Sequence, residues 1–283
     1  MIPAFLLPLI AVAADSAFIT ITKRFFRRYG QLTSREFNWL QFAGIVFVLL
    51  LVIPFFGQMP TAGQLSNTWL LILILVVLAV SANLLYFWGL EHEKISEIEP
   101  FLLFNPLGAI LVVGLFYPDE RNWMIWVAVV LASIVLGWAH IKQHRFAFTR
   151  GLWAIIAFIG VYALHVSVIK TLLVTYDPVT LYFMRSMLVL VGLTIVAMPK
   201  FRLIKAHHLA PFGILGGLAV ASVVAAYTAY QIRGVSETVF VFVLSPILVY
   251  ILSVIFLNEK WKFKNVVASI IITALVILIS LIK

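Results

Sequence analysis

The sequence contains no cysteine among its 283 residues. This absence excludes disulfide bonds, thiolate nucleophiles and cysteine-ligated metal centres. Histidine does not replace cysteine as a ligand, because the adjacent His207 and His208 lie in a basic loop and no second histidine stands at metal-ligand spacing elsewhere. We therefore predict no metal site and no cofactor.

Charged side chains are also scarce. Only 11% of the residues are Asp, Glu, Lys or Arg and 64% are hydrophobic, against roughly 25% and 45–50% in ordinary soluble domains. A single soluble core cannot bury this much apolar surface, and the polar residues gather between long apolar runs. The composition therefore predicts an integral membrane protein whose apolar surface faces lipid.

Ten apolar segments of about 17–24 residues follow one another with short linkers, which leaves no room for a soluble domain. Each segment is close to the roughly 20 residues that a helix needs to cross a hydrocarbon core. We therefore predict an all-α fold with ten transmembrane helices. The segments run over residues 3–22, 36–55, 69–90, 97–116, 123–140, 151–173, 179–198, 210–230, 237–257 and 264–282.

The net charge of +9 is carried mainly by loops. Fifteen Lys and Arg residues lie in the loops after odd-numbered segments, whereas four lie in the other loops and the two tails. By the positive-inside rule, this asymmetry predicts that the odd loops face the cytoplasm and that both termini lie outside. Basic loops at a membrane surface account for the charge, so we expect no nucleic-acid partner.

The chain also repeats itself at shifts of 139 to 147 residues. The matching positions are Ser96-Glu97 with Ser236-Glu237, Pro106 with Pro246, Glu120-Arg121 with Glu259-Lys260, Tyr86 with Tyr227, and Lys23 with Lys170. Five segments separate the copies, and because five is odd, the copies must have opposite orientations across the membrane. Inverted repeats, predicted here as residues 1–145 and 146–283, are typical of alternating-access transporters with a substrate site near the midplane.

Several of these features resemble the drug/metabolite transporter superfamily, EamA type. They are the segment Asp-Pro-Val-Thr-Leu-Tyr-Phe-Met-Arg at 177–185, the two helices with Ser-x9-Pro, and the acid-plus-base turns at Glu120-Arg121 and 257–260. The resemblance spans essentially the whole chain. It implies ten helices in a 5 + 5 inverted repeat and a central cavity lined mainly by the first, third, fourth, sixth, eighth and ninth helices. It also implies secondary transport of small organic solutes.

The chain departs from the family's pattern at two points. Position 38, opposite Arg185, is Asn, which leaves Arg185 without a partner by symmetry. The loop charges place both termini outside, whereas the family usually keeps them inside. The second departure affects the polarity of transport.

Two charged residues lie inside apolar segments. Asp15 lies in the first segment, where a carboxylate costs about 2.5–3.5 kcal/mol unless it faces a wet cavity or a partner. It is a candidate proton or cation site, or alternatively a member of a structural ion pair or a cap on a cavity water. Arg185 lies about seven residues into the seventh segment, and either holds helices together or binds an anionic substrate.

Three acids lie at predicted helix starts. Glu97 and Glu99 open the fourth segment, and Glu237 repeats Glu97 in the ninth. Acids favour the first turn of a helix because of the helix dipole, so capping explains them. The alternative is a vestibule for cations at the membrane face.

Polar and aromatic residues in several segments suit a binding site. His165, in the middle of the sixth segment, is either part of a proton relay or a hydrogen-bonded packing residue. The other candidates are Asn83 and Tyr86 in the third segment, Asn105 before Pro106 in the fourth, and Tyr227 and Tyr230 in the eighth. Aromatic walls with a few polar groups suit an amphipathic solute or an organic cation, although the same residues also anchor helices at interfaces. Four glycines are predicted to permit close helix packing, namely Gly160, Gly213, Gly216 and Gly217.

No paired nucleophile and base, phosphate-cradling loop or ATPase motif occurs in the sequence, which argues against an enzyme and against primary active transport. We predict a secondary transporter, proton-coupled or facilitative, for a small organic solute. It is expected in the plasma membrane of a prokaryote, surrounded by lipid, as a monomer or homodimer. The alternatives are a flippase or scramblase for a lipid or lipid-linked carrier, and a membrane-embedded enzyme.

Overall fold

The computed structural model describes residues 5–28, 32–92, 102, 104–140, 149–204, 206–257 and 263–282. These residues form helices joined by short turns, and no strand occurs among them, which confirms the all-α class. The element order is α1 (Leu6–Arg28), α2 (Ser34–Phe56), α3 (Ala62–His92), α5 (Asn105–Phe116), η1 (Pro118–Glu120), α6 (Trp123–His140), α7 (Arg150–Leu172), α8 (Pro178–Ala197), η2 (Phe201–Leu203), α9 (Ala206–Arg233), α10 (Val235–Val241), η3 (Phe242–Leu244), α11 (Ser245–Leu257) and α12 (Phe263–Ile282).

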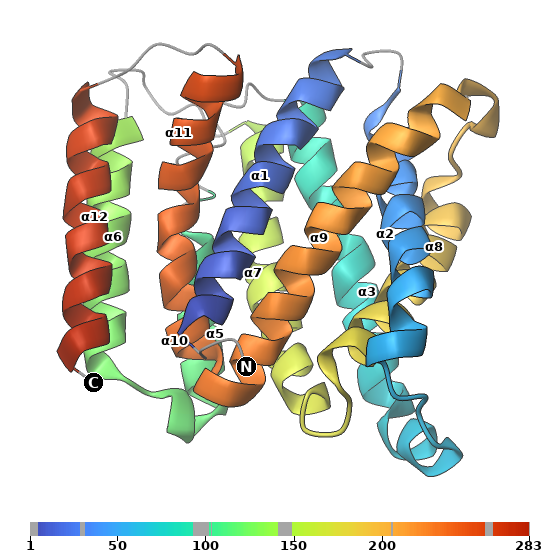
Figure 1. The fold of residues 1–283 in the computed structure, drawn as a ribbon, viewed down its shortest axis with the longest axis horizontal. Helices are drawn as coiled ribbons and strands as arrows, with labels where there is room; N and C mark the ends of the chain where they lie inside the picture. Colours follow the sequence, from blue (N-terminus) through green and yellow to red (C-terminus); the bar gives the residue numbers. More distant parts are fainter. Residues whose placement is uncertain are drawn as a thin grey trace.

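The helices stand side by side, and both chain ends lie at the same end of the molecule, which is the lower end in Figure 1. In the nearer layer α1 packs between α9 and α11, and in the farther layer α7 packs between α3 and α5. The pairs α2 with α8 and α6 with α12 lie at the two flanks. The lower end also carries η1, the α7–α8 turn and the α9–α10 turn.

Local chemistry explains where α8 begins. The Asp177 side chain accepts a hydrogen bond from the backbone N–H of Thr180 at 2.9 Å, and Pro178 occupies the first helical position. Both features favour a helix start. Asp177 also accepts from the backbone N–H of Gln58 at 3.1 Å, so the start of α8 is tied to the chain just after α2.

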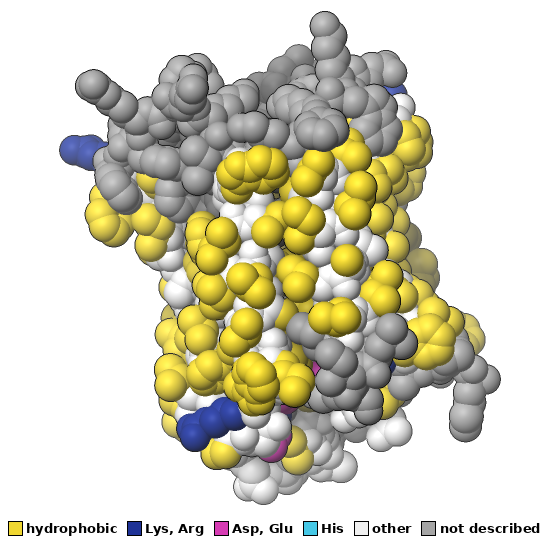
Figure 2. Space-filling view, turned by 90° about the vertical axis from the view of Figure 1, so that its left-hand side faces the viewer, with side chains coloured by type: hydrophobic (Ala, Val, Ile, Leu, Met, Phe, Trp, Pro, Cys, Tyr) yellow, Lys and Arg dark blue, Asp and Glu magenta, His cyan; other side chains and the backbone are white. Residues whose placement is uncertain are grey.

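The outer surface is apolar over most of its height. Figure 2 shows the flank formed by α6 and α12, where hydrophobic side chains cover the middle and the charged side chains drawn lie toward the two ends. Ile134 and Ile277 are 61% and 53% exposed there. Monomeric soluble proteins rarely expose apolar patches of this extent.

Six of the described helices are long and apolar enough to cross a membrane by length and composition, and four further apolar helices are shorter. Together with the apolar surface, these helices identify a membrane-embedded protein. Helices occupy nearly all of the described residues of the predicted apolar segments.

The backbones of α2 and α9 touch. A Cβ atom on Gly216 would lie 2.8 Å from the backbone nitrogen of Ile45 and would overlap with the carbonyl group of Gly44. A Cβ on Gly44 would likewise overlap with a backbone carbonyl of α9. By contrast, Gly160, Gly213 and Gly217 have nothing within 4 Å of such an added atom. The prediction of close packing is therefore confirmed at Gly216 and wrong at the other three glycines.

Candidate functional site

A group of polar and aromatic side chains lies between the helices, and we call it the central cluster. Its members come from α1, α7, α8, α9 and α11, and they are linked by hydrogen bonds, ring contacts or electrostatic interactions. They are Asp15, Tyr162, His165, Tyr182, Arg185, Tyr227, Tyr230 and Ser245. Five of the eight were predicted from the sequence, and the structure brings those five together.

Asp15 is the acidic member of the central cluster. Its carboxylate accepts a hydrogen bond from the Ser245 hydroxyl at 3.2 Å, which joins α1 to α11. The neighbouring Ser16 hydroxyl donates to the carbonyl of Val12 at 2.7 Å and lies 3.3 Å from the Ser245 hydroxyl. Asp15 forms no ion pair with any described residue. A structural ion pair, one of the three roles predicted for Asp15, is therefore not seen in the described part of the chain.

Arg185 is the basic member. One terminal nitrogen donates to the Tyr227 hydroxyl at 3.0 Å, and the guanidinium carbon lies 5.6 Å from the centre of the Tyr182 ring. The buried Nε atom has no hydrogen-bond partner among the described residues, and neither has the side chain of Asn38. Because guanidinium carries five N–H donors, most of its hydrogen-bonding capacity remains for another group.

Aromatic rings line both sides of these charges. On α8 and α9, Tyr227 packs edge-on against Tyr182 and stacks on Tyr230, with ring centres 6.0 Å apart in both pairs. On α7, the Tyr162 ring lies 6.0 Å from the His165 ring. Tyr162 lies close enough to Asp15, Tyr227 and Arg185 to interact with them electrostatically, so the α7 rings are near the charges of α1 and α8.

Three predicted residues have mainly local or packing environments. Asn83 donates to the backbone carbonyl one helical turn earlier, that of Ala79, at 2.8 Å. Tyr86 is half-buried between the rings of Phe87 and Phe158. Asn105 opens α5, and its buried side-chain oxygen has no partner in the described part of the chain.

His165 is 3% exposed, and neither ring nitrogen has a hydrogen-bond partner among the described residues. The predicted hydrogen-bonded packing role is therefore not seen there. Glu97 and Glu99 lie outside the described residues. Glu237 lies in the first turn of α10 and forms an ion pair with Arg233 at 3.2 Å.

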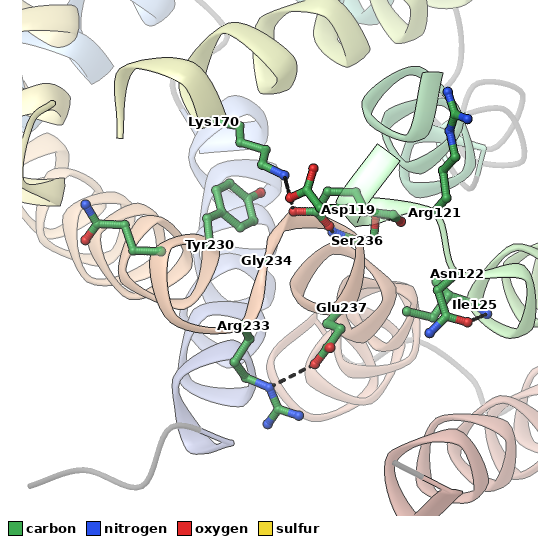
Figure 3. Close-up of a pocket in the computed structure, with 12 residues that line it drawn as sticks. Asp119, Arg121, Asn122, Ile125, Lys170, Tyr230, Arg233, Gly234, Ser236 and Glu237 are labelled. Atoms are coloured by element: carbon green, nitrogen blue, oxygen red, sulfur yellow. Dashed lines mark hydrogen bonds and ion pairs between the residues drawn. The ribbon is translucent and has the colours of Figure 1, made fainter. Parts of the chain in front are cut away.

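The sequence analysis missed a pocket of about 400 Å³ at the lower end (Figure 3). We call it the lower pocket. It is lined by Asp119, Glu120, Arg121, Asn122, Ile125, Lys170, Tyr230, Gln231, Arg233, Gly234, Ser236 and Glu237. The repetition of Glu120-Arg121 and of Ser236 was the available signal, but a repeat shows which positions are equivalent and not which ones touch.

One carboxylate organises the lower pocket. Glu120 accepts hydrogen bonds from the backbone N–H groups of Val235 and Ser236 and from the Lys170 ammonium, each at 2.8 Å. The Ser236 hydroxyl donates to the Glu120 backbone carbonyl at 3.0 Å. We call these four residues the Glu120 network. Glu120 is only 6% exposed, whereas Asp119, which also binds Lys170, is 71% exposed.

Gly234 is required by this arrangement. Its φ angle of +87° lies in the region that favours glycine, and an added Cβ would lie 2.9 Å from a carboxylate oxygen of Glu120. The chain can therefore turn from α9 into α10 while the first two N–H groups of α10 point at the carboxylate.

The Glu120 network predicts an acid-sensitive stability. Burial raises the pKa of Glu120, but hydrogen bonds from Lys170, Ser236 and Val235 outweigh burial and hold that pKa below its ordinary value. The stabilisation is therefore present above about pH 4.3, which is the pKa of a glutamate in the unfolded chain. It is lost as pH falls through the lower pKa of Glu120 in the folded protein. Glu120→Gln should lower the free energy of unfolding at pH 7 by about 1–3 kcal/mol and remove this acid-dependent part. Unfolding in detergent micelles at pH 7 and at about pH 3, below the ordinary pKa, measures both effects.

Asp119→Asn is the matched control. The bond from Lys170 lowers the pKa of Asp119 as well, but its carboxylate is exposed and contacts no backbone of α10. Its loss should change stability by well under about 1 kcal/mol. Equal unfolding curves for Glu120→Gln and the native protein at both pH values would contradict the role given to Glu120.

A helical protein embedded in a membrane, with opposite charges and aromatic rings held between its helices, belongs to the class of multi-pass membrane proteins with an internal polar site. Residues 148–281 match the model of the EamA-like transporter family, and this match places the protein in the drug/metabolite transporter superfamily. The match supports a membrane protein of the transporter type, the type that the resemblance in the sequence implies.

A comparison with solved structures bears on the fold. A solved crystal structure, described only as that of a protein, is 16% identical and superposes with a TM-score of 0.75. The match covers 99% of this chain and 96% of that chain. At this identity the likeness shows only that the two proteins share a fold. The shared fold includes both halves of the sequence. No curated protein matches the chain.

Proposed function

We propose that the protein is a secondary transporter that carries a small amphipathic organic solute across the membrane by alternating access. The observation that carries the proposal is the pair Asp15 and Arg185. Both charges lie among aromatic rings inside the bundle, and neither is ion-paired with a described residue. Ionisable groups at this depth are expensive and usually functional.

The proposed architecture is ten membrane helices in two inverted repeats, residues 1–145 and 146–283. Six long and four shorter apolar helices support the number, and two termini at one end agree with an even number of crossings. The central cluster takes Asp15 from the first half and its other seven members from the second. A site made by both halves changes its exposure when one half rocks against the other.

The cluster's chemistry suggests the kind of solute. The free donors of Arg185 suit an acidic group, since guanidinium binds carboxylate and phosphate in a fork geometry. The Tyr162, Tyr182 and Tyr227 rings suit an apolar or aromatic body. Asp15 suits a proton or an ammonium group, and a proton site beside the solute is the simplest means of coupling.

Uptake into proteoliposomes tests the proposal. A library of small amphipathic solutes is presented with and without a pH gradient, and we expect at least one to accumulate against its own gradient when the pH gradient is present. Asp15→Asn should abolish this accumulation, because the amide cannot exchange a proton, while downhill exchange of the same solute persists.

Asp119→Asn, which removes an exposed carboxylate at the lower end, is the control and should transport as the native protein does. Full pH-driven accumulation by Asp15→Asn would exclude Asp15 as the coupling residue. No uptake of any solute by the native protein, under either condition, would count against transport itself.

We infer further that the membrane is a prokaryotic plasma membrane and that the lower end, with both termini, faces outside. The support for the orientation is the excess of Lys and Arg in the loops after odd-numbered segments. Reporter fusions at each terminus test this placement, and two cytoplasmic reporters would reverse it.

A further inference from the structure

The lower pocket ends against the central cluster. Tyr230 lines the pocket, and its ring stacks on that of Tyr227, which accepts the hydrogen bond from Arg185. Figure 3 shows Tyr230 beside Lys170 and Asp119 at the edge of the pocket. Two stacked rings therefore separate Arg185 from the lower end of the molecule.

The Glu120 network holds three separate elements of the chain together next to these rings. Glu120 ends η1, between α5 and α6, and Lys170 lies in the last turn of α7. Val235 and Ser236 begin α10, directly after the turn that follows α9. The network therefore joins the first half of the chain, through Glu120, to two separate elements of the second half.

The charged side chains of the lower pocket that are described next are each bound to a partner within the protein. Lys170 binds both Glu120 and Asp119 and lies 4.4 Å from the centre of the Tyr117 ring. Arg121 donates to the backbone carbonyl of Gly114 at 2.7 Å, and Arg233 is paired with Glu237. A binding site for a charged solute would present unpaired groups, as the central cluster does. In the lower pocket, the ion pairs and hydrogen bonds instead hold separate elements of the protein together.

The helix that the network holds, α10, is short and is bounded at both ends by a change in backbone geometry. α10 has only seven residues and is followed by η3 before α11 continues the segment. Gly234, with its positive φ angle, precedes it. A short helix between a glycine turn and a break in the helical hydrogen bonding is a common place for a local change of direction.

We propose that the Glu120 network is a gate, whose formation closes the route between the central cluster and the lower end and whose opening is required for passage there. This inference rests on the proposed transport function. The sequence repeat supports it, because each of its three polar side chains falls on a duplicated position: Glu120 on Glu259, Lys170 on Lys23 and Ser236 on Ser96. Ser96, Glu259 and the side chain of Lys23 lie outside the described residues.

The absence of native cysteine makes the gate directly measurable, because one introduced cysteine is the only thiol in the protein. Ser245→Cys is a nearly isosteric reporter in the central cluster, where Ser245 is 7% exposed and bonded to Asp15. A membrane-impermeant maleimide is applied to the lower side of oriented vesicles, with no solute and no pH gradient. Labelling should be slow in the otherwise native protein.

Adding Glu120→Gln should raise the labelling rate of Ser245→Cys from the lower side by about tenfold or more, the population shift expected when a closing contact is lost. The neutral amide cannot form an ion pair with Lys170, and it places an N–H₂ group against one of the two N–H donors of α10. Lys170→Gln, which leaves the bonds from Glu120 to α10 in place, should raise the rate as well and serves if Glu120→Gln does not fold.

Two controls make the result specific. Asp119→Asn removes the other carboxylate bound to Lys170 but no contact with α10, and should leave the rate within about twofold of the native value. Val174→Cys, at a position 86% exposed in the α7–α8 turn, should react equally fast in the native and Glu120→Gln backgrounds. An unchanged rate in folded Glu120→Gln, or an equal increase in Asp119→Asn, would overturn the gate.

The labelling experiment tests the gate and the transport experiment tests the proposed function, so each proposal can be contradicted without the other. Faster labelling in Glu120→Gln supports the gate even if no solute is ever transported. The absence of transport would contradict the proposed function but not the gate. Unchanged labelling in a protein that does transport would remove the gate and leave the proposed function intact.

Discussion

Arg185→Gln is expected to reduce transport of an acidic solute by roughly 30-fold to several thousand-fold. The reason is that the acidic group of the bound solute would lose the charge of Arg185, and removing one member of a buried charge pair costs about 2–5 kcal/mol. Arg185 uses one donor on Tyr227, and its buried Nε is without a partner among the described residues. The remaining donors are those that a carboxylate or phosphate would accept. Uptake by proteoliposomes measures the loss.

The choice of solutes separates binding from a purely structural role. An acidic solute and its neutral amide are compared, and Arg185→Gln should remove the preference for the acid. Arg185→Lys should restore only part of it, since ammonium keeps the charge but not the planar fork. Equal losses for acid and amide, with a lowered stability in micelles, would mean that Arg185 holds helices together instead.

Gly216→Ala is expected to destabilise the protein by roughly 1–3 kcal/mol, and Gly216→Leu to prevent folding, because the added carbon overlaps with the backbone of α2. Backbone atoms cannot move aside as the end of a side chain can. The free energy of unfolding in mixed micelles measures the first variant, and the elution profile from a sizing column measures the second.

The neighbouring residue provides a close control. Gly217 lies on the same helix and has open space around an added Cβ, so Gly217→Ala should stabilise by up to about 1 kcal/mol through helix propensity. Adjacent alanine substitutions are thus expected to act with opposite sign. A stabilised Gly216→Ala would show that α2 and α9 are not in backbone contact.

The parts of the fold that depend on local chemistry were predictable from the sequence. The lengths of the apolar segments follow from the thickness of a bilayer, so the helices lie where those segments predicted. Asp177-Pro178 marks the start of α8 because a capping side chain and a preset φ angle act within one turn. Asp15 and Arg185 stood out because any charge in an apolar run requires a reason.

Contacts between distant segments were not predictable. Glu120 and Ser236 were each recognised as repeated positions, but that they bind one another depends on how η1 packs beside α10. The same limit applies to the glycines, since a sequence of small residues permits close approach on any face and only packing decides which face is used. Gly216 and Gly217 are indistinguishable until α2 is in place.

The contact of Gly44 with Gly216 also restricts how the molecule can move. α2 belongs to the first half of the chain and α9 to the second, and their backbones already touch, so the halves cannot approach further at this point. Separation would leave a void lined by backbone that no glycine side chain can fill. The distance between the two halves of the chain is therefore set where α2 meets α9, on the side of the molecule away from the flank formed by α6 and α12 (Figure 1).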